Sequence, residues 1–112
     1  MKQLNSVEQF EAALVDSDAQ RVFVFKHSTA CPVSAVAYEQ VQRYETAASS
    51  DSPPVYLVKV IEARPVSNEI AKRLAVTHQS PQLILVKGRK AVWSATHFGI
   101  QQRAIEEALN KL

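Results

Sequence analysis

Short apolar runs alternate with amphipathic stretches along this chain. Apolar residues at helical spacing predict a first helix, capped by Asn5 or Ser6 with a Glu or Gln three positions on, and ending near residues 16–18. Residues 21–26 are rich in β-branched and aromatic side chains, which predicts a buried strand. A short polar loop is expected over residues 27–30.

Proline marks the start of a second helix. Pro32 suits the first helical position, because its missing N–H would have no partner there in any case. This places Cys31 at the N-cap of the helix. One apolar stripe is expected on that helix, formed by Val33, Val36, Ala37, Val41 and Tyr44.

The second half of the chain repeats the alternation. We expect a surface connection over residues 47–54, a strand over residues 55–61 and a short helix capped by Ser67. A buried strand over residues 83–86 leads into a hairpin, because Gly88 at the first turn position suits a type II′ turn. The remaining elements are a returning strand over residues 90–96 and a last amphipathic helix that carries Ile105, Ala108, Leu109 and Leu112.

This order of elements predicts the fold class. A strand-helix-strand unit implies a parallel pair with a right-handed crossover, and the later hairpin adds antiparallel strands. We therefore expect an α/β fold with a mixed central sheet flanked by helices. With 112 residues, 46% of them hydrophobic, the chain fits a single domain over residues 1–112 with one core.

Charge and hydropathy limit the partners of the protein. A formal net charge of +2, spread along the chain without a basic run, argues against nucleic acid. No secretion signal is recognisable at the N-terminus, and no apolar run approaches the roughly 20 residues that span a bilayer. We expect a soluble, cytoplasmic monomer that does not bind membranes.

Cys31 carries the chemistry that the sequence suggests. It is the only cysteine, so any disulfide must join another molecule. A helix N-terminus favours the thiolate, the nucleophilic form, through its free N–H groups and helix dipole. A lone cytosolic cysteine is often just a small buried hydrophobe. The coincidence of strand, polar loop, cysteine and proline in one segment favours the reactive interpretation.

The sequence around Cys31 resembles a known family. Cys31-Pro32-Val33-Ser34 is a Cys-x-x-Cys arrangement with serine in the second position, similar to the thioredoxin-like superfamily. More closely, residues 25–34 resemble the YtxJ-type monothiol bacilliredoxins, whose motif runs Thr-Cys-Pro-Ile-Ser. The similarity extends through most of the chain, including residues 78–85. Ala30 departs from the family threonine, and Val33 from its isoleucine.

The resemblance implies a thioredoxin-like fold and a redox function. Cys31 would remove bacillithiol, a low-molecular-weight thiol, from client proteins that carry it as a mixed disulfide. Bacillithiol is then a thiol co-substrate, S-bacillithiolated proteins are the clients, and no other cofactor is expected. Since the chain has no second cysteine, an external thiol or reductase must restore Cys31.

Supporting roles are expected for several further residues. Ser34 could donate a hydrogen bond to the thiolate, or be an ordinary polar residue of a first helical turn. By resemblance to thioredoxins, Pro81 would be a cis-proline facing the sulfur, with the backbone of Ser80 pairing with an extended substrate. His27 could contact substrate and tune the thiolate, although a solvated or backbone-bonded histidine is commoner.

Other functions remain open at this point. An iron-sulfur carrier similar to the monothiol glutaredoxins is the nearest rival, but those proteins have Cys-Gly-Phe-Ser where this chain has Pro32 and Val33. A non-enzymatic thioredoxin-like binding module is another, and a cysteine hydrolase lacks a recognisable base. No metal site is expected, since the three histidines and the cysteine lack ligand spacing. Possible contacts for an anionic thiol are Lys26, Lys72 and Arg73.

Overall fold

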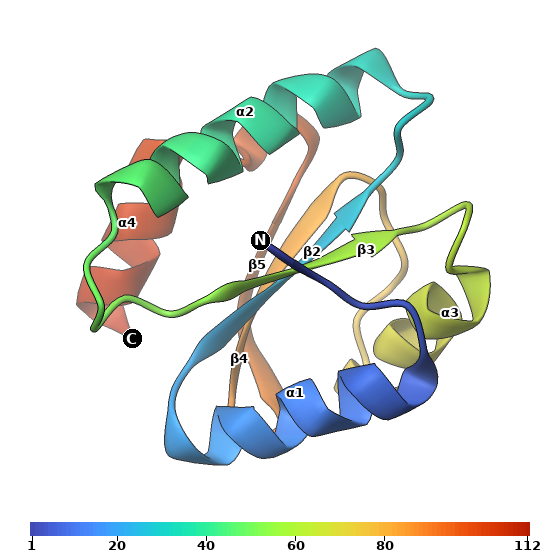
Figure 1. The fold of residues 1–112 in the computed structure, drawn as a ribbon. Helices are drawn as coiled ribbons and strands as arrows, with labels where there is room; N and C mark the ends of the chain where they lie inside the picture. Colours follow the sequence, from blue (N-terminus) through green and yellow to red (C-terminus); the bar gives the residue numbers. More distant parts are fainter.

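A five-stranded mixed sheet forms the centre of the computed structural model, which describes residues 1–112 (Figure 1). The strands are β1 (Lys2–Gln3), β2 (Val22–His27), β3 (Val55–Lys59), β4 (Gln82–Lys87) and β5 (Lys90–Thr96). Their order in the sheet is β1-β3-β2-β4-β5. β3 pairs in parallel with β1 and β2, whereas β4 is antiparallel to β2 and β5. The predicted mixed α/β sheet is confirmed.

Four α-helices cover the two faces of this sheet. They are α1 (Val7–Ala19), α2 (Pro32–Ala47), α3 (Arg64–Leu74) and α4 (Gln102–Lys111), with a short 3₁₀ helix, η1 (His97–Gly99), after β5. Figure 1 shows α1 and α3 on one face and α2 and α4 on the other. None of these helices combines the length and apolar character that crossing a membrane requires.

The core consists of two hydrophobic clusters, one on each face of the sheet. Because side chains alternate along a strand, Val22 and Val24 of β2 pack with α1 and α3, whereas Phe23 and Phe25 pack with α2 and α4. The same alternation continues to the end of β2. Lys26 therefore lies on the α1/α3 face and His27 on the α2 face.

The N-terminus of α1 forms the predicted cap. Ser6 is the N-cap, and its Oγ accepts a hydrogen bond from the backbone N–H of Gln9 at 3.1 Å. The side-chain oxygen of Gln9 accepts in return from the N–H of Asn5 at 2.6 Å. The two bonds satisfy one N–H of the first turn and one N–H of the residue before the cap. The helix ends at Ala19, slightly beyond the predicted end.

The predicted cap of α3 at Ser67 is wrong. The helix begins at Arg64, with Ala63 as its N-cap, four residues before the predicted cap, and Pro65 lies in its first turn. Proline suits that turn because no intrahelical N–H is required there. Ser67 instead lies inside the helix and is buried.

Two further expectations need correction. Gly88 and Arg89 both have positive φ angles, 57° and 64°, which is a type I′ pattern and not the predicted type II′. On α2 the buried face contains Ser34 in addition to Ala37, Val41 and Tyr44, while Val36 of the predicted stripe is 48% exposed.

β1 was not predicted from the sequence. Its two residues lie beside Tyr56 and Leu57 of β3, and the N–H of Leu4 donates to the carbonyl of Leu57 at 2.8 Å. So short a strand shows no alternation that a sequence pattern could reveal.

Candidate active site

Cys31 lies at the N-terminus of α2, where the loop after β2 meets the helix. It is the N-cap residue, with extended backbone angles and Pro32 directly after it, as predicted. Its carbonyl accepts from the N–H of Ala35 at 3.2 Å, and its own N–H donates to the carbonyl of Ser28 at 3.3 Å. The thiol is free and half-buried. A half-buried thiol beside the positive end of a 16-residue helix is placed for nucleophilic chemistry.

Ser34 lies one helical turn after Cys31 and is completely buried. Its Oγ accepts a hydrogen bond from the backbone N–H of Ser28 at 3.0 Å. This bond joins the first turn of α2 to the loop that precedes Cys31. No hydrogen bond links Ser34 to the sulfur, so Ser34 fixes the backbone around the nucleophile, and the predicted donation to the thiolate stays a prediction.

Pro81 lies at the same end of the sheet as the loop of Cys31. β2 and β4 are antiparallel, with Lys26 opposite Gln82, so the residues just before β4 lie beside those just after β2. The Ser80-Pro81 peptide bond is cis, as predicted. The carbonyl of Pro81 accepts from the N–H of His97 at 3.1 Å. The hydroxyl of Ser80 is buried and has no partner within the protein.

His27, the last residue of β2, lies under α2 and is 8% exposed. Its ring packs against Tyr38 and Phe25, with centroid distances of 4.9 and 5.7 Å, and its Nδ1 has no partner. Burial lowers the pKa of His27 from 6.5, aided by the charge of Lys59 and opposed by the backbone of Ser34. The imidazole is therefore neutral near pH 7.

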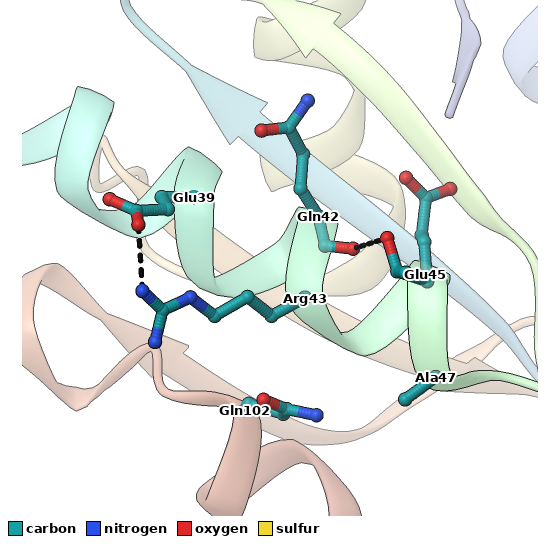
Figure 2. A pocket seen from close by; sticks show the side chains of 7 residues that line it. Glu39, Gln42, Arg43, Glu45, Ala47 and Gln102 are labelled. Atoms are coloured by element: carbon teal, nitrogen blue, oxygen red, sulfur yellow. Dashed lines mark hydrogen bonds and ion pairs between the residues drawn. The ribbon is translucent and has the colours of Figure 1, made fainter.

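A polar cavity of about 430 Å³ adjoins His27, between α2 and the strands β1 and β3. Thr29, from the loop before Cys31, lines it together with Lys59 and Tyr38. A larger hollow of about 620 Å³ lies elsewhere, over the second half of α2 and the start of α4. Figure 2 shows its side chains, with Arg43 paired to Glu39 at 2.8 Å. Neither Cys31 nor Pro81 lines this hollow.

Lys26 forms a second polar cluster, on the opposite face of the sheet from His27. Its side chain is completely buried, and its Nζ lies 3.0 Å from Nδ1 of His78. Ser67 Oγ lies 3.5 Å from the same nitrogen. The sequence suggested Lys26, Lys72 and Arg73 as contacts for an anionic thiol. Of these three, only Lys26 lies at the end of the sheet that carries Cys31 and Pro81. Lys72 and Arg73 lie in the last turn of α3, where Arg73 pairs with Glu11 and Glu69.

The acidic side chains, the histidines and Cys31 do not form a metal-binding group of three or more. His27, His78 and His97 lie on β2, the loop before β4, and η1.

Comparison with known proteins now identifies the family. The family model described as monothiol bacilliredoxin BrxC matches residues 2–105. The chain belongs to the monothiol bacilliredoxin family. The resemblance noted in the residues around Cys31 is thus confirmed, and a thiol-based redox function follows from membership of this family.

Solved structures confirm the thioredoxin fold of this bacilliredoxin. One, provisionally assigned as an oxidoreductase with a thioredoxin fold, is 33% identical with a TM-score of 0.84, covering 96% of this chain and 92% of that one. Fasciola hepatica thioredoxin is 15% identical with a TM-score of 0.76, covering 99% and 98%. Mitochondrial thioredoxin 3 from Saccharomyces cerevisiae is 20% identical with a TM-score of 0.72, covering 100% and 95%.

Sequence reasoning missed part of what surrounds the bacilliredoxin motif. Tyr38 joins His27 through the packing of α2 on the sheet, and Lys59 joins it through the pairing of β3 with β2. No local pattern reveals either contact. The cluster around His78 did leave one signal, because Lys26 is a charged residue at the end of an apolar strand.

Proposed function

We propose that this protein removes bacillithiol from S-bacillithiolated client proteins by monothiol exchange at Cys31. The Cys31 thiolate attacks the bacillithiol sulfur of the mixed disulfide. A disulfide forms between Cys31 and bacillithiol while the bond from bacillithiol to the client breaks. The client leaves as a thiolate with the electron pair of that bond and takes a proton from water.

The observation that carries this proposal is the position of a lone cysteine at the N-cap of α2. The helix N-terminus supports the thiolate, and the absence of a second cysteine in the chain excludes an internal resolving step. A second bacillithiol thiolate, or a reductase, must therefore attack the adduct. With bacillithiol as the reductant, the products are free Cys31 and bacillithiol disulfide.

The residues around Cys31 suit an extended client segment. In this proposal the backbone of Ser80 pairs with the segment, and Pro81 packs beside the mixed disulfide. The unpartnered hydroxyl of Ser80 is available to a substrate group, since buried polar groups normally have partners. His27 is neutral near pH 7 and contacts a substrate only through the polar cavity that it lines together with Thr29. Such exchange belongs in a reducing compartment, the cytoplasm.

The decisive experiment follows the release of bacillithiol from a modified client protein. Cys31→Ala and Cys31→Ser should both abolish release, because neither side chain can form a disulfide. Ser50→Ala changes an exposed serine in the connection after α2, well separated in sequence from Cys31. It is the matched control and should keep the wild-type rate. Release by Cys31→Ala at the wild-type rate would refute the proposal and favour a binding module.

The intact mass of the wild-type protein gives a second, independent readout. After one turnover without added reductant, the protein should carry one bacillithiol, and Cys31→Ser should carry none. A brown protein with visible absorption after anaerobic reconstitution with iron and sulfide would favour the iron-sulfur carrier instead.

A further inference from the structure

The most unusual side chain outside the Cys31 motif is the buried Lys26. It is 0% exposed, and none of the ion pairs of the protein includes it. A buried ammonium without a carboxylate costs several kcal/mol of desolvation. Burial lowers the pKa of Lys26 to about 8, so the side chain is still mainly charged at pH 7. This charge faces a single hydrogen-bond partner, Nδ1 of His78 at 3.0 Å.

That hydrogen bond determines where His78 carries its proton. An ammonium group can only donate, so Nδ1 must accept and the ring proton resides on Nε2. Burial lowers the pKa of His78 from 6.5, and the charges of Lys26 and Arg64 lower it further. His78 is therefore neutral at pH 7, with Nε2–H as its donor.

The backbone on both sides of His78 is fixed by one buried side chain. Gln82 Nε2 donates to the carbonyl of Thr77 at 3.1 Å, and its Oε1 accepts from the N–H of Gln79 at 3.4 Å. His78 itself is exposed. Its outward donor thus has a fixed position before any ligand arrives, which reduces the entropy lost on binding.

This donor lies at the same end of the sheet as the proposed exchange site, and two positive charges lie near it. The segment of His78 leads directly into Ser80 and Pro81, at the sheet end that carries Cys31. Arg64, the first residue of α3, is exposed and takes part in no ion pair. A neutral N–H donor flanked by two uncompensated cations is suited to a carboxylate.

We propose that His78 binds a carboxylate of the thiol that is exchanged at Cys31. Lys26 is the positioning residue that holds His78 in the Nε2–H form, and Arg64 adds attraction for the anion. The inference rests on the proposed function, in which the exchanged thiol, bacillithiol, carries carboxylates. It adds a residue that selects anionic thiols over neutral ones.

The test compares two mixed disulfides on one client peptide. One carries mercaptosuccinate, a dicarboxylate thiol, and the other carries neutral 2-mercaptoethanol. His78→Ala should lower kcat/KM for the mercaptosuccinate disulfide about tenfold and that for the neutral disulfide by less than about twofold. An equal loss on both would overturn the inference and leave the proposed function standing, since the effect of His78 would then not depend on the carboxylates of the thiol.

Binding without turnover separates the inference from the proposed function. Titration of the protein with succinate should shift the NMR signals of the His78 ring, and His78→Ala should abolish saturable binding. If the protein exchanges neither disulfide but succinate still binds at His78, the exchange function falls and the carboxylate site stands. Absence of binding at His78 would overturn the site.

Lys26→Met tests the positioning role, because methionine fills a similar volume without charge. Nitrogen NMR should show His78 with its proton on Nε2 in the wild type and a mixture of both tautomers in the variant. The preference for the mercaptosuccinate disulfide should fall several-fold with no change on the neutral one. An unchanged tautomer and preference would refute the role of Lys26.

Arg64→Gln tests the contribution of the second cation. It should weaken succinate binding a few-fold at low salt and have little effect at high salt, where an exposed charge is screened. Lys87→Gln removes an exposed cation at the opposite end of β4 and is the matched control. Equal effects of the two variants would show that only net charge matters.

Discussion

Ser34 Oγ lies 3.0 Å from the backbone nitrogen of Ser28 and accepts its hydrogen bond, which joins the first turn of α2 to the loop after β2. The serine that occupies the second position of the Cys-x-x-Ser motif therefore has a structural task of its own. It holds the backbone through which Cys31 is presented.

Replacing Ser34 with Ala should weaken both the fold and the exchange reaction. The N–H of Ser28 would lose its acceptor, the buried Ser34 hydroxyl, and would have no partner in its place. This should lower the free energy of unfolding by about 1–3 kcal/mol. Release of bacillithiol should also be slower, because the loop before Cys31 is less constrained. Urea unfolding and client release measure the two effects, with Ser50→Ala as the control. Wild-type stability in Ser34→Ala would show that the bond contributes nothing.

Replacing Ser34 with Cys should change the route of reset. The introduced thiol can attack the adduct on Cys31, expel bacillithiol and form an internal disulfide. Mass spectrometry should then find the oxidised protein without bacillithiol, and dithiol reductants should restore it better than bacillithiol does. If the adduct persists on Cys31 as in the wild type, the two sulfurs do not meet.

Replacing Lys26 with Met should stabilise the protein near neutral pH. The unfolded lysine keeps its proton up to about pH 10.5, whereas the folded one loses it near pH 8, so the unfolded state binds more protons between these values. Wild-type stability consequently rises with pH across this interval relative to the variant. We expect Lys26→Met to be more stable by about 1–3 kcal/mol at pH 7, with the advantage declining above pH 8. A constant difference from pH 7 to pH 11 would contradict this prediction.

Acid should destabilise the protein through His27. Its pKa is lowered by burial, so below pH 6.5 the unfolded state takes up a proton that the folded state resists. Stability is therefore lost as the pH falls from 6.5 toward the pKa of folded His27. His27→Phe, packed between Phe25 and Tyr38, should lose less stability between pH 7 and pH 5. Unfolding in urea at both pH values measures this difference.

The sequence predicted those parts of the fold that depend on local patterns. The strand at residues 22–27 could be predicted because a dense run of β-branched and aromatic residues favours a strand locally. The helix that begins at Pro32 could be predicted because proline favours the first position of a helix. The predicted start of α3 is wrong because Pro65, in the first turn, marks the start of the helix better than Ser67 does. β1 was missed because it exists only through pairing with β3.

The same distinction applies to the candidate site. Cys31 at its N-cap could be predicted from adjacent residues alone. The meeting of Lys26 with His78 spans 52 positions and depends on the antiparallel register of β2 and β4. The spacing of residues in a single sequence does not reveal that register, so the contact between Lys26 and His78 could not be predicted.

The single cysteine has a consequence for what the protein senses under the proposed reaction. Each exchange consumes one bacillithiol and produces one bacillithiol disulfide, so at equilibrium the oxidised fraction of Cys31 follows the ratio of these two molecules. A dithiol protein would instead release two thiols on forming its internal disulfide, which makes its oxidised fraction depend on the square of the thiol concentration. Dilution of the whole thiol pool would therefore oxidise a dithiol protein and leave Cys31 unchanged.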